Sequence, residues 1–247
     1  MIQKSSILFL FLLLLPGCTI IDWGKRTFNQ GCQINPCIRI IPQQHIRSTR
    51  VYYEFTTLGI FDAMWLTNEV QKCHIKLFAK KNFISEEQAQ EMLDKRCLEN
   101  RDLISFYVQV HVPHVSNPLT NNPDSPWMVS LKVGDKTYLP YCLKKVILDR
   151  EFKYLFGKYT SQFKTVYLLQ FSAKDSDGEN IIQPGIEYIG LCFHAMENIA
   201  TLTWELDEDG KMLKNCSPQG YCINYNRSCE ICEKKEINIT CRENECI

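Results

Sequence analysis

The sequence predicts an α+β fold: an N-terminal helical hairpin packed on an antiparallel β-sandwich, followed by a disulfide-rich, irregular C-terminal tail. Three observations predict it. Apolar residues recur at spacings of three and four between residues 58 and 100. Five to seven short segments with alternating apolar residues follow, without helical crossovers, which is typical of an antiparallel sandwich or barrel. Six of the 13 cysteines fall in the last 32 residues.

We expect four regions, with boundaries set by these changes of pattern. They are a leader at residues 1–17, a tether or irregular lead-in at 18–50, the helical hairpin and sandwich at 51–210, and a cysteine-rich tail at 211–247.

The leader combines one positive charge at Lys4 with nine consecutive apolar residues at 7–15 and a small residue, Gly17, before Cys18. This is the layout of a secretory signal peptide. The apolar run is too short for a membrane-spanning helix, which needs about 20 residues.

Leu15, Pro16, Gly17 and Cys18 resemble the lipobox of bacterial lipoproteins, a resemblance that covers residues 1–18. It implies cleavage before Cys18, a diacylated Cys18 thiol and a new amino group that can take a further chain such as palmitate. Two or more acyl chains hold a protein stably at a membrane, at about 0.8 kcal/mol per buried CH₂. In such lipoproteins an aspartate directly after the lipidated cysteine favours retention in the inner membrane. This chain has Thr19 at that position, so the resemblance favours the outer membrane. We therefore expect a protein anchored to the cell envelope.

The composition, with 45% hydrophobic and 23% charged residues, is close to the globular average. The loss of Lys4 with the leader changes the net charge from 0 to −1. Nucleic acid is bound largely through Lys and Arg contacts to phosphate, and the chain has no long basic run. The expected partners are the membrane, through the lipid, and a protein or a glycan.

The lead-in has no helical or strand period, and a Cys32–Cys37 pair can close a short loop in it. An amphipathic helix is then predicted over residues 58–80. A capping box at Ser85, in the stretch SEEQ, starts a second helix that ends near Asn100.

The strands are predicted where apolar and polar residues alternate. Residues 151–157 suggest a single helical turn between two of them, and DSDG at 175–178 and DEDG at 207–210 are predicted to be turns, not calcium loops. The predicted strand segments are 103–112, 127–133, 136–143, 163–171, 186–194 and 200–206.

The cysteines other than Cys18 number twelve, and an even set in an exported protein favours disulfides. A bridge that closes a loop of about 15 residues stabilises a fold by roughly 3 kcal/mol. Cys73 and Cys97 either bridge the two helices or are buried separately. The candidates are Cys32, Cys37, Cys73, Cys97, Cys142, Cys192, Cys216, Cys222, Cys229, Cys232, Cys241 and Cys246.

A metal site is the alternative for the tail, where Cys229 and Cys232 stand beside Cys241 and Cys246. Cysteine pairs of this kind bind structural zinc, although the second pair is wider than usual and the compartment favours oxidation. A redox role for Cys229-x-x-Cys232 lacks the expected βαβ context.

Catalysis has two candidate locations. His111 and His114 form H-x-x-H at a strand end, and Cys192 and His194 share a strand face, where a histidine can activate a thiolate. No established catalytic motif is present, and no cofactor is implied. We expect a non-catalytic binding or structural module, with an envelope enzyme or a zinc-stabilised tail module as the alternatives.

Overall fold

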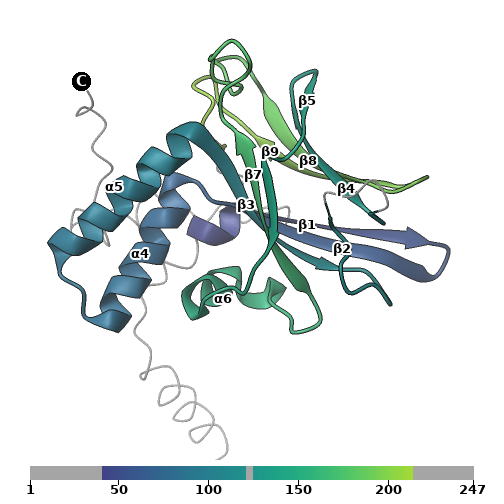
Figure 1. The fold of residues 1–247 in the computed structure, drawn as a ribbon, viewed down its shortest axis with the longest axis horizontal. Helices are drawn as coiled ribbons and strands as arrows, with labels where there is room; N and C mark the ends of the chain where they lie inside the picture. Colours follow the sequence, from purple (N-terminus) through teal and green to yellow (C-terminus); the bar gives the residue numbers. More distant parts are fainter. Residues whose placement is uncertain (1–40, 121–124, 214–247) are drawn as a thin grey trace, which may run out of the picture. The chain divides into compact units, whose positions relative to one another are not determined.

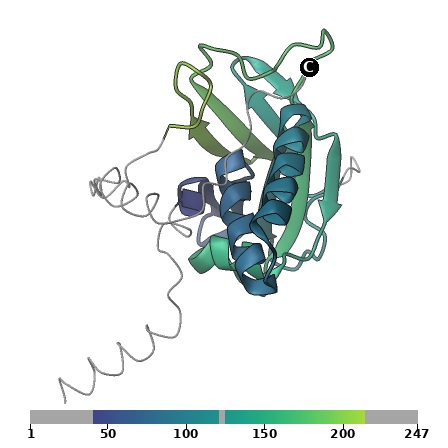
Figure 2. The same cartoon turned by 90° about the vertical axis from the view of Figure 1, so that its left-hand side faces the viewer.

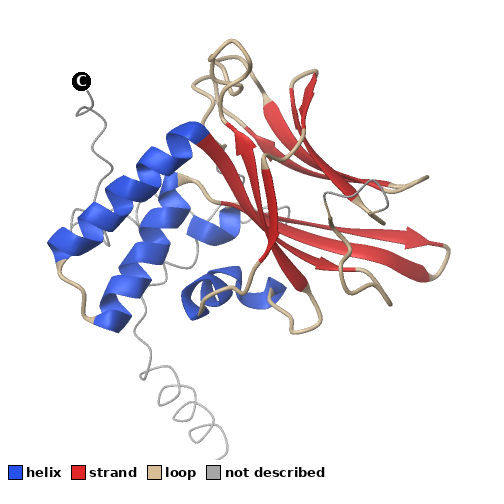
Figure 3. Ribbon diagram, viewed as in Figure 1, coloured by secondary structure: helices blue, strands red, loops and turns tan. Residues whose placement is uncertain are grey.

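The computed structural model describes residues 41–120 and 125–213. Two antiparallel sheets, a pair of long helices and shorter helical segments make up this part of the chain (Figure 1, Figure 3). The α+β class and the packing of a helical hairpin with antiparallel sheets are confirmed. From residue 214 onward, the predicted tail lies outside the described residues.

The first sheet has five strands in the order β1-β2-β3-β7-β6, and every pair is antiparallel. The second strand, β2, pairs with the edge strand β1 on one side and with the central strand β3 on the other. The strands are β1 (Ile46–Tyr53), β2 (Thr56–Trp65), β3 (Leu103–His111), β7 (Thr165–Ser172) and β6 (Cys142–Lys145).

The second sheet has four strands in the order β5-β4-β8-β9 and is also antiparallel. Its strands are β5 (Lys136–Tyr138), β4 (Met128–Val133), β8 (Tyr188–His194) and β9 (Ile199–Glu205). The predicted segment 136–143 therefore divides between two sheets. Pro140, which has no N–H for a sheet ladder, lies between the two halves.

The two sheets share one hydrophobic core, to which both contribute fully buried aromatic rings. Phe61 on β2 stacks on Phe193 of β8 with ring centroids 4.4 Å apart, and Phe106 on β3 contacts Trp204 of β9 at 5.1 Å. At one edge the sheets are tied together by Arg47, whose Nε donates to the Thr203 carbonyl at 2.9 Å.

The helical hairpin consists of α4 (Asn68–Asn82) and α5 (Glu86–Asp102), and it connects β2 to β3. Figure 2 shows the two helices side by side. Ile75 on α4 packs with Ala89, Leu93 and Cys97 on α5. The predicted capping box is confirmed: Ser85 accepts from the Gln88 N–H, and the Gln88 side chain accepts from the Ser85 N–H.

The prediction of one helix over residues 58–80 was wrong for its first part, because residues 56–65 form β2. Phe61 and Ala63 face the core between the sheets, whereas Asp62 and Met64 are buried on the opposite face. A strand buried on both faces has apolar residues at many spacings, including three and four. The helix begins only after Thr67, which caps it by accepting from the Val70 N–H.

Three further differences are local. β1 begins at Ile46, inside the segment predicted as lead-in. Residues 150–156 form the seven-residue helix α6 (Arg150–Phe156), followed by the 3₁₀ turn η1 (Gly157–Tyr159). The acidic DSDG and DEDG segments are turns, as predicted, with Gly178 at φ 82° and Gly210 at φ 74°.

Candidate functional site

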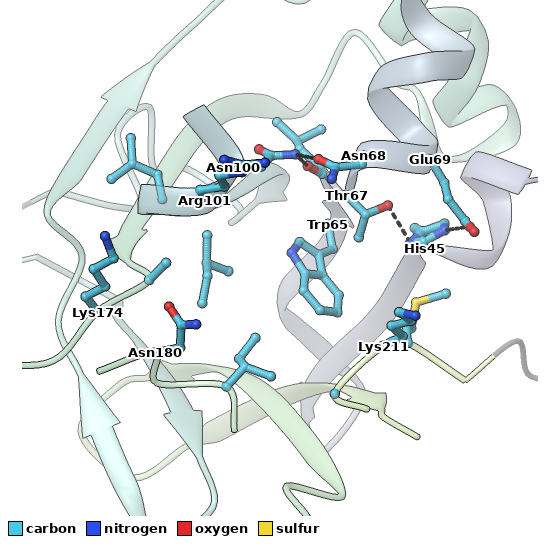
Figure 4. Close-up of a pocket in the computed structure, with 17 residues that line it drawn as sticks. His45, Trp65, Thr67, Asn68, Glu69, Asn100, Arg101, Lys174, Asn180 and Lys211 are labelled. Atoms are coloured by element: carbon cyan, nitrogen blue, oxygen red, sulfur yellow. Dashed lines mark hydrogen bonds and ion pairs between the residues drawn. The ribbon is translucent and has the colours of Figure 1, made fainter. Parts of the chain in front are cut away.

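A pocket of about 700 Å³ opens where β2 ends and β3 begins, and we call it the Trp65 pocket (Figure 4). Its walls are the ends of α4 and α5 that meet the sheet and the segments 173–182 and 210–212. Volumes of about 300–1,000 Å³ are typical of small-molecule sites. Its apolar lining includes Leu66, Leu103, Ile104, Ile182 and Met212.

Trp65, the last residue of β2, lies at the centre of the lining residues, with its half-buried indole among them (Figure 4). Two buried aromatic residues hold this ring in place. The Phe106 ring lies nearly parallel to it at 6.2 Å, and the Trp204 ring meets it edge-on at 6.4 Å. The pocket therefore contains a rigid aromatic surface.

One wall is built by a hydrogen-bonded group of three side chains. His45 is 2% exposed, and its Nδ1 and Nε2 lie 3.3 Å from Thr67 Oγ1 and from Glu69 Oε2. The Thr67 hydroxyl accepts from the Val70 N–H as the helix cap, and its own proton is available to donate to His45 Nδ1 in the tautomer that carries the imidazole proton on Nε2. The Nε2–H of His45 then donates to the Glu69 carboxylate, so that this carboxylate already has a partner.

Two asparagines at the helix ends form an amide pair. Asn100 Nδ2 donates to the Leu66 carbonyl at 2.9 Å and to Asn68 Oδ1 at 2.8 Å. This arrangement fixes the end of α5 against the start of α4. It also leaves the Asn100 carbonyl oxygen as an acceptor and the Asn68 NH₂ as a donor.

The charges of the pocket are unbalanced. Arg101, Lys174 and Lys211 line it together with a single carboxylate, that of Glu69. Lys174 Nζ lies 3.2 Å from Asp102 Oδ1, and Lys211 Nζ lies 3.9 Å from Asp209 Oδ2. All four side chains are at least half exposed, so both pairs are weak, and neither aspartate lines the pocket. The N-terminus of α4 and the C-terminus of α5 both end here, and their dipoles oppose each other. The side chains therefore decide the sign, which is positive.

The predicted histidine pair does not line this pocket. His111 Nδ1 lies 3.0 Å from the carbonyl oxygen of Phe163. His114 is exposed in a turn, where its backbone φ is 62°. Among residues 41–120 and 125–213, no three His, Cys, Asp or Glu side chains are grouped so that they could hold a metal ion.

The predicted Cys192/His194 pair is not hydrogen-bonded in the structure. His194 Nε2 instead lies 3.2 Å from Ser130 Oγ on neighbouring β4, whereas the Cys192 sulfur accepts from Thr201 Oγ1 at 3.7 Å. Strand pairing explains why His194 contacts a serine. Ser130 lies directly opposite Cys192 in the β4–β8 register, on the strand face that Cys192 and His194 share, and it is therefore within reach of the His194 side chain. No contact that would let His194 activate the thiol is formed.

The disulfide predictions are corrected at three positions, because Cys73, Cys142 and Cys192 carry thiols. The cross-strand partners of Cys142 and Cys192 are Gln170, Ser130 and Thr201, and none of them is a cysteine. The considered Cys73–Cys97 bridge is therefore absent. Cys97 is disulfide-bonded, and its partner is none of these three.

The other predicted sites lie outside the described residues, so the structure does not bear on them. They are the lipid attachment site Cys18 and the cysteines Cys32, Cys37, Cys216, Cys222, Cys229, Cys232, Cys241 and Cys246, including the alternative zinc ligands.

Sequence reasoning missed the Trp65 pocket entirely. Its residues are spread from His45 to Met212, and no short motif joins them. One local signal was available: Thr67 and Glu69 mark a helix start directly after Trp65, which would have placed this tryptophan at a strand–helix junction.

Within the described residues, no helix is long and apolar enough to cross a membrane. Comparison with known proteins does not assign the site. No protein-family model, curated protein or solved structure matches the chain.

Proposed function

We propose that this protein is a lipid-anchored, non-catalytic binding protein of the bacterial envelope, which holds a small polar ligand in the Trp65 pocket. The observation that carries the binding function is the pocket itself, in which a fixed indole, an amide pair and three cationic side chains converge. A mostly apolar cavity with a few convergent polar groups is the usual form of a small-molecule site.

Binding is favoured over catalysis by where the candidate reactive groups lie. None of His111, His114, Cys192 and His194 lines the pocket. The one histidine that does, His45, is held between Thr67 and Glu69 and is almost completely buried.

Membrane attachment is supported by the leader and by the lipobox-like residues that end at Cys18. With this attachment, the described residues would stand at the membrane surface in an oxidising compartment. We also propose that the cysteines of the tail form disulfides, because such a compartment favours oxidation of the thiols.

Ligand binding is tested by closing the pocket. Asn180 is exposed and its side chain lines the pocket, so that Asn180→Trp fills the opening without disturbing the core. The full chain is purified from cells, and small molecules that co-purify are detected by native mass spectrometry. We expect a bound molecule in the wild-type protein and its loss in Asn180→Trp.

The matched control is Ser176→Trp, which places the same side chain on the same exposed segment but outside the pocket. It should retain the bound molecule. A wild-type protein that carries no molecule and shows no thermal shift with a library of polar metabolites would contradict the proposal.

Attachment is tested by peptide mass spectrometry of the protein from membranes. A mature chain that begins at Cys18 with an acyl mass supports it, and Cys18→Ser should move the protein to the soluble fraction. A mature chain that begins elsewhere without lipid would overturn attachment and leave the binding function standing.

A further inference from the structure

We propose that the ligand of the Trp65 pocket is an acidic sugar, that is, a pyranose ring that carries a carboxylate or phosphate group. This inference rests on the proposed function, since it names the ligand of the same pocket. Three independent properties of the lining each select one part of such a molecule.

The charge of the pocket selects the acidic group. Glu69 is engaged by His45. The carboxylates that contact Lys174 and Lys211, those of Asp102 and Asp209, are 71% and 78% exposed and do not line the pocket, so they compete only weakly with an acidic ligand. Arg101 presents a planar set of N–H donors that matches a carboxylate or a phosphate in bidentate fashion. Lys174 lies on the same side of the pocket, and its ammonium keeps further donors while it contacts Asp102.

The indole of Trp65 selects a ring. Its face is apolar and carries the negative part of the aromatic quadrupole. The C–H face of a pyranose is apolar and slightly positive at the hydrogens, so the two faces are complementary. Because Phe106 and Trp204 fix the indole, the protein orders no further side chain when a ring stacks on it.

The asparagines select hydroxyl groups. A sugar hydroxyl both donates and accepts hydrogen bonds. The hydrogen bond between Asn100 and Asn68 leaves the Asn68 NH₂ group as a donor and the Asn100 side-chain oxygen as an acceptor, so this pair can bind such a hydroxyl. Asn180 adds a third amide on the side of Lys174 (Figure 4). A fatty acid would use the cations but not these amides, and an acidic peptide would not offer the ring face that the indole matches.

The experiment is calorimetric titration of the purified full chain with four probes: D-glucuronate, D-glucose 6-phosphate, D-glucose and acetate. We expect at least one of the two acidic sugars to bind at least about tenfold more tightly than glucose, because one charge-assisted hydrogen bond increases affinity by about this factor. The better of the two identifies carboxylate or phosphate as the acidic group. Acetate, which has neither ring nor hydroxyls, should not bind in the same concentration range.

Arg101→Gln tests the charged contact. It should weaken acidic-sugar binding about tenfold and leave glucose binding unchanged. Arg150→Gln is the matched control, since Arg150 is an exposed arginine outside the pocket, and this variant should bind every probe as the wild type does. Circular dichroism confirms that both variants are folded.

Two results would overturn the ligand class alone: glucose that binds as tightly as both acidic sugars, or an Arg101→Gln variant that binds them unchanged. The same holds if all four probes fail while a different molecule, such as an acidic peptide, co-purifies and is lost in Asn180→Trp. If all probes fail and no molecule co-purifies, the proposed function fails as well.

Discussion

At the scale of single residues, the structure contains an ion pair that no sequence pattern indicates. Asp62 on β2 is 2% exposed, and Lys164, just before β7, lies 2.5 Å from its Oδ2 with a side chain that is 14% exposed. Lys164 Nζ also donates to the Tyr159 carbonyl at 3.0 Å. A buried carboxylate is tolerated only with such a partner, because the loss of its hydration is costly.

We therefore expect Lys164→Met to destabilise the protein by about 3–5 kcal/mol, since it leaves Asp62 buried without a counter-charge. The free energy of unfolding in urea measures this. The double variant Asp62→Leu/Lys164→Met should recover most of the loss. Lys153→Met, at an exposed position of α6, should change stability by no more than about 0.5 kcal/mol. Equal losses in the two lysine variants would refute the burial argument.

At the scale of elements, α4 and α6 are joined through one histidine. His74 on α4 stacks on Phe152 of α6 at 4.0 Å, and its Nε2–H donates to Asp149 Oδ2 at 2.9 Å. Asp149 is also the N-cap of α6, where it accepts from the Phe152 N–H. Burial raises the pKa of Asp149, but the hydrogen bonds from His74 and Phe152 and the charges of His74 and Lys81 bring it below its ordinary value.

A carboxyl group whose pKa is lower in the folded state stabilises the fold above its unfolded pKa of about 3.9, and this contribution is lost as the pH falls through the folded-state value. Asp149→Asn keeps a good helix cap but removes the charge. We expect it to cost about 0.5–1 kcal/mol at pH 6, a modest amount because the carboxylate is 43% exposed to screening solvent.

The difference between this variant and the wild type should shrink as the pH falls below the unfolded pKa of about 3.9 and through the lower folded-state pKa of Asp149, where the wild-type carboxylate also becomes protonated. Urea unfolding at a series of pH values measures it. A difference that stays constant across this range would show that the shape of the side chain matters here and its charge does not.

At the scale of the whole molecule, the chain crosses between the sheets three times. It passes from β3 to β4, from β5 to β6 and from β7 to β8, so that residues distant in sequence share one core. The same crossings place the thiols of Cys142 and Cys192 in different sheets, whereas Cys97 is disulfide-bonded.

Alkylation with iodoacetamide under denaturing conditions checks this distribution of thiols. Without reductant, Cys142 and Cys192 should be modified and Cys97 should not. A reduced sample serves as the control and should show all three modified. Modification of Cys97 without prior reduction would disprove its disulfide.

The sequence by itself determined the parts of the fold that depend on neighbouring residues. The Ser85 capping box, the two acidic turns and the alternating strands β3, β4 and β9 follow from local hydrogen bonding and from the period of two along a strand. The α+β class follows from the order of these elements.

Tertiary structure decided what depends on strand pairing. β2 is a strand because β1 and β3 pair with it on both sides and its two faces are buried, although its spacing resembles a helix. Pairing of β4 with β8 gave His194 a serine partner instead of Cys192. The Trp65 pocket likewise gathers residues from His45 to Met212, and only packing across the two sheets and the helix ends can bring such distant side chains together.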